Sequence, residues 1–259
     1  MSVGSGVVTT TFFVMFGLFF MFTLYLQFVR GYSPLNAGLA TLPLALTLVA
    51  VAPRSASVAE KIGSGTVISI GFLFVAAGFS VLSFVHPDTP YLVLVVALVL
   101  LGAGMSFTAA PATGNIMSAV PHYKAGVGSA VNDTTREVGG ALGIAVLGSI
   151  ASAVYRSSVN LDGLTLPPPV LSAAKESVGA ASAMSQGLPE GREVATRAGT
   201  AFTHAFTATS RVAVALCLLA AAVVFSVFNR KAELAANPQT TTPSAPPMAP
   251  EPELADEIS

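Results

Sequence analysis

Three charged residues, Asp133, Arg136 and Glu137, follow one another in an otherwise apolar part of the chain. At positions i, i+3 and i+4 they share one face of a predicted helix. Ionisable groups inside a bilayer are costly and usually face a cavity or a charged partner, which makes these three candidates for a proton switch. The alternative is that this turn lies at the membrane surface, where Arg136 pairs with the two carboxylates.

Other chemistry finds little support in the sequence. The histidines, His86, His122 and His204, fall in different loops or span ends and lack the spacing of metal ligands. No glycine-rich phosphate loop follows a strand, so we expect neither an enzyme nor a bound cofactor. The net charge of -1 argues against nucleic acid as a partner, because no basic excess is available to neutralise phosphates.

The elements that must position the charged residues are membrane helices. Of the 259 residues, 53% are hydrophobic and only 10% are charged, whereas soluble domains carry about 25% charged residues. The apolar run near the start of the chain contains no Lys or Arg before Arg30 and exceeds the h-region of a signal peptide. We therefore interpret it as a transmembrane helix.

Six segments are long and apolar enough to cross a bilayer core, and the chain is predicted to be an all-α membrane protein with six transmembrane helices. The segments cover residues 7–29, 35–53, 66–85, 91 to about 120, about 130–155 and about 202–228. Pro43 and Pro111 are expected to kink the second and fourth spans. Gly139 and Gly143 form a small-xxx-small face suited to close helix contact.

Basic residues predict the orientation of the bundle. With both termini cytoplasmic, the inner segments carry five basic residues and the short outer loops carry only Arg30. The five are Arg54, Lys61, Lys124, Arg230 and Lys231. We therefore expect a multi-pass protein of the plasma membrane with both termini inside.

The predicted organisation has four parts. Residues 1–155 hold five transmembrane helices, and residues 156–201 form an extracytoplasmic loop with an amphipathic helix from about Glu193. Residues 202–231 hold the sixth transmembrane helix. Residues 232–259, rich in proline and ending in carboxylates, are expected to be a disordered cytoplasmic tail.

The first span carries a cluster of large apolar side chains: Phe12, Met15, Phe16, Phe19, Phe20 and Met21. An aromatic and thioether lining would suit bulky apolar ligands. The alternative is packing in the core or against lipid.

Several strings, in order and spacing, resemble one group of transporters, the fourteen-span drug/proton antiporters of the major facilitator superfamily. Residues 24–27, 31–35, 37–39 and 42–43 are similar to the start of that group's C-terminal half. Residues 128–132, Arg136, and residues 139–143 and 145–148 are similar to its penultimate-span signature.

The resemblance implies that the six spans form half of a major facilitator bundle, the second of two halves that rock about a central site. Residues 53–65 resemble a degraded copy of the superfamily's cytoplasmic loop motif, with Glu60 and Lys61 in place of an Asp-Arg pair. Two features of the family's first half have no counterpart here. One is the antiporter motif with its Gly-Pro in the family's fifth span, and the other is the arginine that is linked to proton coupling. A separate N-terminal transporter half is therefore an expected partner.

The resemblance further implies a component of a multidrug efflux proton antiporter, concerned with antibiotic resistance. Its expected partners are the lipid bilayer, protons and an amphiphilic small-molecule substrate. Candidate cavity or coupling residues are Tyr25, Gln27, Asn115, Asn132 and Asp133, and Arg136 and Glu137 are candidates for a gate or pairing network. The alternative function is a non-transporting truncated membrane protein or a partner-binding membrane module.

Overall fold

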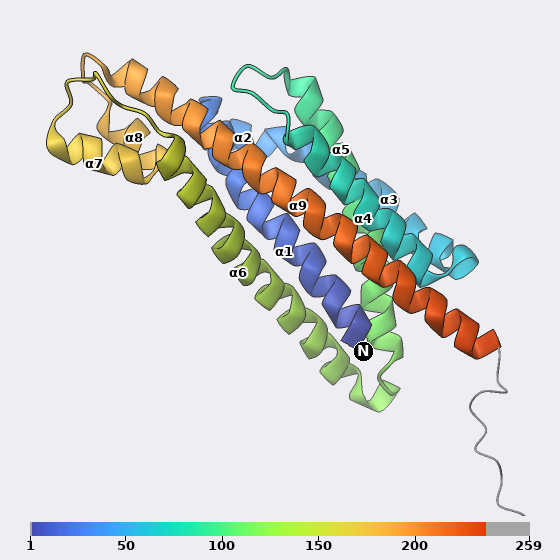
Figure 1. Ribbon diagram of the computed structural model, residues 1–259. Helices are drawn as coiled ribbons and strands as arrows, with labels where there is room; N and C mark the ends of the chain where they lie inside the picture. Colours follow the sequence, from blue (N-terminus) through green and yellow to red (C-terminus); the bar gives the residue numbers. More distant parts are fainter. Residues whose placement is uncertain (1, 237–259) are drawn as a thin grey trace, which may run out of the picture.

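A computed structural model of the protein describes residues 2–236 (Figure 1). Most of the predicted tail, from residue 237 onward, lies outside the described residues. Six helical stretches within the described part are long and apolar enough to cross a membrane, which confirms the predicted all-α architecture.

Eleven helical elements follow one another along the described residues, and the longest connection, from α6 to α9, contains α7 and α8. In chain order they are α1 (Ser2–Leu24), a π-helical turn (Tyr25–Val29), α2 (Pro34–Ala40), α3 (Leu42–Ile62), α4 (Ser64–Leu82), α5 (Tyr91–Ser118), a 3₁₀ turn (His122–Lys124), α6 (Ala125–Ser158), α7 (Pro168–Glu176), α8 (Val178–Met184) and α9 (Gly191–Ala236). The start of α1 and the described end of α9 lie at one end of the bundle, and α7 and α8 lie at the other (Figure 1).

The core is built around α1, which packs along α6 and also touches α5 and α9. On the far side α4 lies against both α5 and α9, whereas α3 packs mainly against α5 and is largely exposed. Large apolar side chains from these helices, among them Phe22, Phe72, Phe79 and Phe206, are fully buried. The burial of rings from α1, α4 and α9 joins distant parts of the chain into one core.

Glycine allows α1 and α6 to approach closely. A Cβ atom on Gly139 would lie 2.5 Å from the carbonyl oxygen of Thr9, and one on Gly143 would overlap the carbonyl of Phe13. Helix association in membranes depends on such close packing, since lipid is as apolar as the helix surfaces. The predicted packing role of Gly139 and Gly143 is confirmed.

Two predictions for residues 34–65, one of a loop and one of a kink, are wrong. The predicted loop at residues 53–65 is helical as far as Ile62, because the residues after Pro53 include good helix formers and Gly63, at φ 88°, makes the turn. The kink predicted at Pro43 is instead a break between α2 and α3, since Thr41 ends one helix and Pro43 occupies the first turn of the next.

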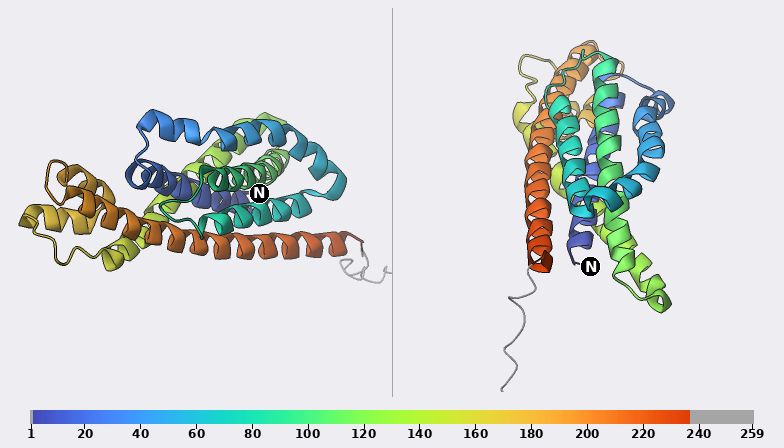
Figure 2. Two further views of the ribbon diagram at one scale, coloured as in Figure 1. Left: turned by 90° about the horizontal axis from the view of Figure 1, so that it is seen from above. Right: turned by 90° about the vertical axis from the view of Figure 1, so that its right-hand side faces the viewer.

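The helix that contains the sixth predicted span begins at Gly191, ahead of the predicted start of that span at about residue 202. The boundary at 201/202 falls inside α9, a single helix that extends beyond the bundle (Figure 2). No proline occurs between residues 191 and 236, so nothing in the backbone interrupts the helix. The amphipathic segment predicted from Glu193 is therefore the first part of α9. The last residues of α9 cover positions 232–236, which were predicted to belong to the tail.

Candidate functional site

The three charged residues singled out in the sequence line a groove beside the contact of α1 with α6. The groove has a volume of about 530 Å³. Phe12 and Phe16 of α1 form one wall. The other wall is formed by residues of α6: Asp133, Arg136, Glu137, Gly140, Ala141 and Ile144.

Helical periodicity explains why these side chains meet. Phe12 and Phe16 are four residues apart on α1, and Asp133 and Glu137 are four apart on α6, so each pair lies on one face. The groove stays open at its centre because Gly140 has no side chain. A Cβ there would lie 3.1 Å from the ring of Phe16.

Arg136 does not form the predicted ion pairs with the carboxylates. Its guanidinium lies over the ring of Phe12, with the central carbon 4.5 Å from the ring centroid. Such a cation–π contact contributes about 0.5–1 kcal/mol at an exposed site. Among the residues whose side chains the structure describes (4–121 and 123–228), the one ion pair is formed by Arg197 and Glu193, at the other end of the molecule.

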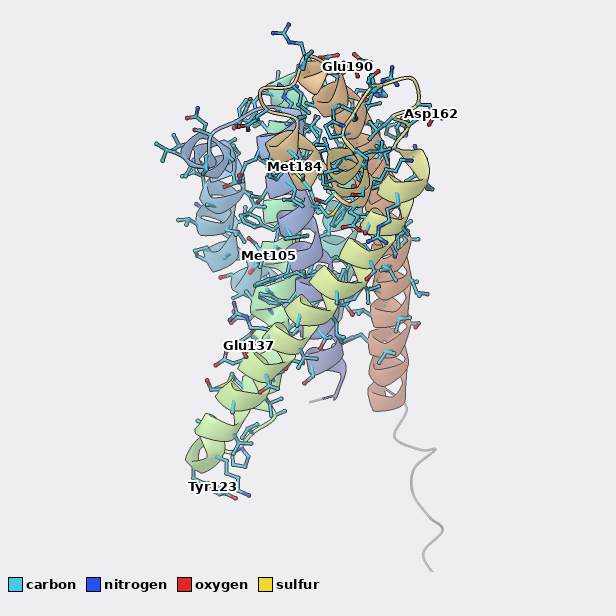
Figure 3. The ribbon with its side chains drawn as sticks, turned by 90° about the vertical axis from the view of Figure 1, so that its left-hand side faces the viewer. Met105, Tyr123, Glu137, Asp162, Met184 and Glu190 are labelled. Carbon is cyan, nitrogen blue, oxygen red and sulfur yellow. The ribbon has the colours of Figure 1, made fainter. Side chains whose placement is uncertain are left out.

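The two carboxylates therefore stay exposed in the groove. Around the axis of α6, Asp133 and Glu137 lie farther from α1 than Arg136 does, and both are exposed. Figure 3 shows Glu137 on this exposed side of α6, in the half of the helix that leads down to Tyr123. The groove thus places two exposed carboxylates beside two aromatic rings, with the nearby cation directed towards α1.

Asn132, by contrast, lies inside the bundle and outside the groove. Its side chain is buried, and its amide oxygen accepts a hydrogen bond of 3.1 Å from the hydroxyl of Thr113. This bond joins α5 to α6 near the end of the bundle where α1 begins. The geometry favours a structural role for Asn132.

Tyr25 also lies outside the groove. Its ring is fully buried and stacks on Phe206 with centroids 5.3 Å apart, and its hydroxyl donates a 2.8 Å hydrogen bond to the carbonyl of His86. Arg30 reinforces the same junction by donating to the carbonyls of Pro87 and Thr89. The π-helical turn is therefore tied to the α4–α5 connection and to α9.

The two remaining candidates are half-buried and do not line the groove. Gln27 lies in the π-helical turn, and Asn115 lies near the end of α5. Of the seven residues proposed from the sequence, the structure brings together Asp133, Arg136 and Glu137. Phe12 and Phe16, noted in the sequence only as aromatic residues, complete the groove.

Comparison with known proteins identifies what this bundle is similar to. The family model described as Major Facilitator Superfamily matches residues 5–144. The multidrug efflux pump LfrA of Mycolicibacterium smegmatis is 35% identical over 217 residues, which cover 83% of this chain and 43% of the relative.

Two further relatives are similar over a shorter stretch. The multidrug resistance protein Stp of Mycobacterium tuberculosis is 35% identical over 146 residues, 56% of this chain and 27% of the relative. The puromycin resistance protein pur8 of Streptomyces alboniger is 37% identical over 148 residues, 54% of this chain and 29% of the relative. The chain aligns with less than half the length of each of these three proteins.

Proposed function

Because the chain belongs to the Major Facilitator Superfamily, we propose that it forms one half of a proton-coupled transporter that exports amphiphilic small molecules. The observation that carries this proposal is the α1–α6 groove, where two carboxylates lie exposed beside two phenylalanine rings. The names of the three relatives, which refer to multidrug efflux, multidrug resistance and puromycin resistance, support the same direction of transport.

The groove offers a simple way to exchange protons for substrate. Asp133 and Glu137 carry like charges at i and i+4, which destabilises an exposed helix by about 0.2–0.5 kcal/mol. The repulsion grows when water is excluded. A proton or a cationic group on the substrate relieves the same repulsion, so the two compete for one site. We propose that this competition couples proton entry to substrate exit.

A second bundle would turn the groove into part of a closed cleft. α1 exposes Phe16, Phe19 and Phe20, and α3 exposes a row of large apolar residues that includes Leu42, Leu46 and Val49. Superfamily transporters rock two such halves about a shared site near the middle of the membrane. We propose that a six-helix N-terminal half packs against this face, with lipid on the side of α4 and α9.

Residues 1–259 expressed alone are expected to leave drug accumulation unchanged, because one bundle cannot alternate access by itself. Co-expression with the first six-helix half of a similar exporter is expected to lower ethidium accumulation in an efflux-deficient host. The measurement is cell fluorescence with and without an uncoupler. Export by the single chain, or unchanged accumulation with both halves present, would contradict the proposal. The second result would favour a partner-binding role.

Both ends of the chain are proposed to be cytoplasmic, with α7 and α8 outside. A cysteine placed at Ala183, which is exposed on α8, is expected to react with a membrane-impermeant maleimide in intact cells. A cysteine at Glu60, exposed at the end of α3, should react only after the cells are opened. The native Cys217 is buried and serves as the background. The reverse labelling pattern would show the opposite orientation.

A further inference from the structure

A second cavity lies farther along the line of contact between α1 and α6 (the α1–α6 seam), where α6 ends and α9 begins. Its volume is about 560 Å³, within the 300–1,000 Å³ typical of small-molecule pockets. α1, α6 and α9 form its walls, and residues 176–179 at the junction of α7 and α8 cover one side. Ile144 lines both this cavity and the charged groove, so the two adjoin along α6.

The α7–α8 cover is fixed to the bundle, which makes the cavity a preformed site. The hydroxyl of Tyr155 on α6 donates a buried 2.7 Å hydrogen bond to the carbonyl of Ala174 on α7. Arg197 on α9 donates to the carbonyl of Asp162 at 3.0 Å. Apolar side chains of the cover are also buried: Val170, Ala174, Val178 and Ala181.

The chemistry of the lining selects one kind of ligand. Aromatic and aliphatic side chains predominate, among them Phe20, Leu24, Phe28 and Phe202. Glu176, the last residue of α7, is the one charged side chain among the described lining residues. An anion would be repelled by this carboxylate. A cation would be attracted both by it and by the faces of the rings.

We propose that this outer cavity binds an amphiphilic organic cation, with the cationic group beside Glu176 and the apolar body against Phe20, Phe28 and Phe202. The proposal deepens the proposed function and rests on it. A cation that leaves the groove at Asp133 and Glu137 would meet a third carboxylate, that of Glu176, at the far end of the α1–α6 seam before release. Binding at this cavity can nevertheless be measured without transport.

The test uses the full chain in nanodiscs with two probes of the same shape and opposite charge, tetraphenylphosphonium and tetraphenylborate. Binding to empty nanodiscs is subtracted. Glu176→Gln is expected to weaken phosphonium binding about two- to fivefold, as loss of a partly screened ion pair predicts. Borate binding should not weaken. Asp162→Asn removes a carboxylate of the same outer segment that does not line the cavity, and it should leave both affinities unchanged.

Ser152→Trp provides a second variant, because an indole on this α6 position would fill the cavity. It is expected to remove phosphonium binding at the Glu176-dependent site. Unchanged binding in either Glu176→Gln or Ser152→Trp would overturn the inference. If phosphonium binding instead falls only with Asp133→Asn, the ligand occupies the groove. That result would reject the outer site while supporting the proposed function.

Discussion

Asp133→Asn, in a transporter that carries both bundles, is expected to reduce substrate-driven proton flux at least tenfold. The asparagine keeps the shape of the side chain and removes the charge that protons and substrate are proposed to share. Asp133 lies exposed in the groove, and Arg136 is directed towards Phe12. The charge of Asp133 is therefore available for exchange and is not used in an internal ion pair.

The flux is measured in proteoliposomes with a pH-sensitive dye inside, after addition of substrate outside. Asp162→Asn is the matched control, since it removes an exposed carboxylate between α6 and α7, away from the groove. Its flux should equal that of the wild type. Unchanged flux in Asp133→Asn would assign Asp133 to the membrane surface as a structural residue, the alternative that the sequence left open.

Gly143→Ala is expected to destabilise the bundle strongly for a change of one methyl group. The added methyl would overlap the backbone carbonyl of Phe13, which cannot move without separating α1 from α6. Overpacking of this kind costs about 1–3 kcal/mol. The apparent melting temperature in detergent should therefore fall by several degrees, measured by size-exclusion chromatography after heating.

Gly148→Ala is the control on the same helix. No atom of a neighbouring helix lies within 4 Å of the Cβ that it would add. Alanine has a higher helix propensity than glycine by about 0.5–1 kcal/mol, so this variant should be as stable as the wild type or slightly more stable. Equal melting temperatures for the two variants would show that α1 and α6 do not depend on the glycine contact.

The number and type of the spans, and the helix face that the charged residues share, can be predicted from the sequence alone. These features are local, because helical periodicity and apolar length are encoded within each segment. The same reasoning identified Gly139 and Gly143 as a contact surface, although it did not identify Thr9 and Phe13 as the backbone that they meet.

Helix ends were predicted less well, because local signals at a boundary are weak. The continuation of α3 to Ile62 and the start of α9 at Gly191 depend on uninterrupted backbone hydrogen bonding. A loss of hydrophobicity does not by itself end a helix. The membrane boundary and the helix boundary are therefore different positions, and hydropathy reports only the first.

The neighbour that each candidate side chain meets depends on how the helices pack against one another. The tertiary structure places Arg136 over Phe12, pairs Asn132 with Thr113 and buries Tyr25 against Phe206, all contacts between separate helices. Glu176, at the end of the short helix α7, likewise lies over the end of the α1–α6 seam. The rotation of one helix against another depends on packing summed over the whole bundle, and no single segment of the sequence carries that information.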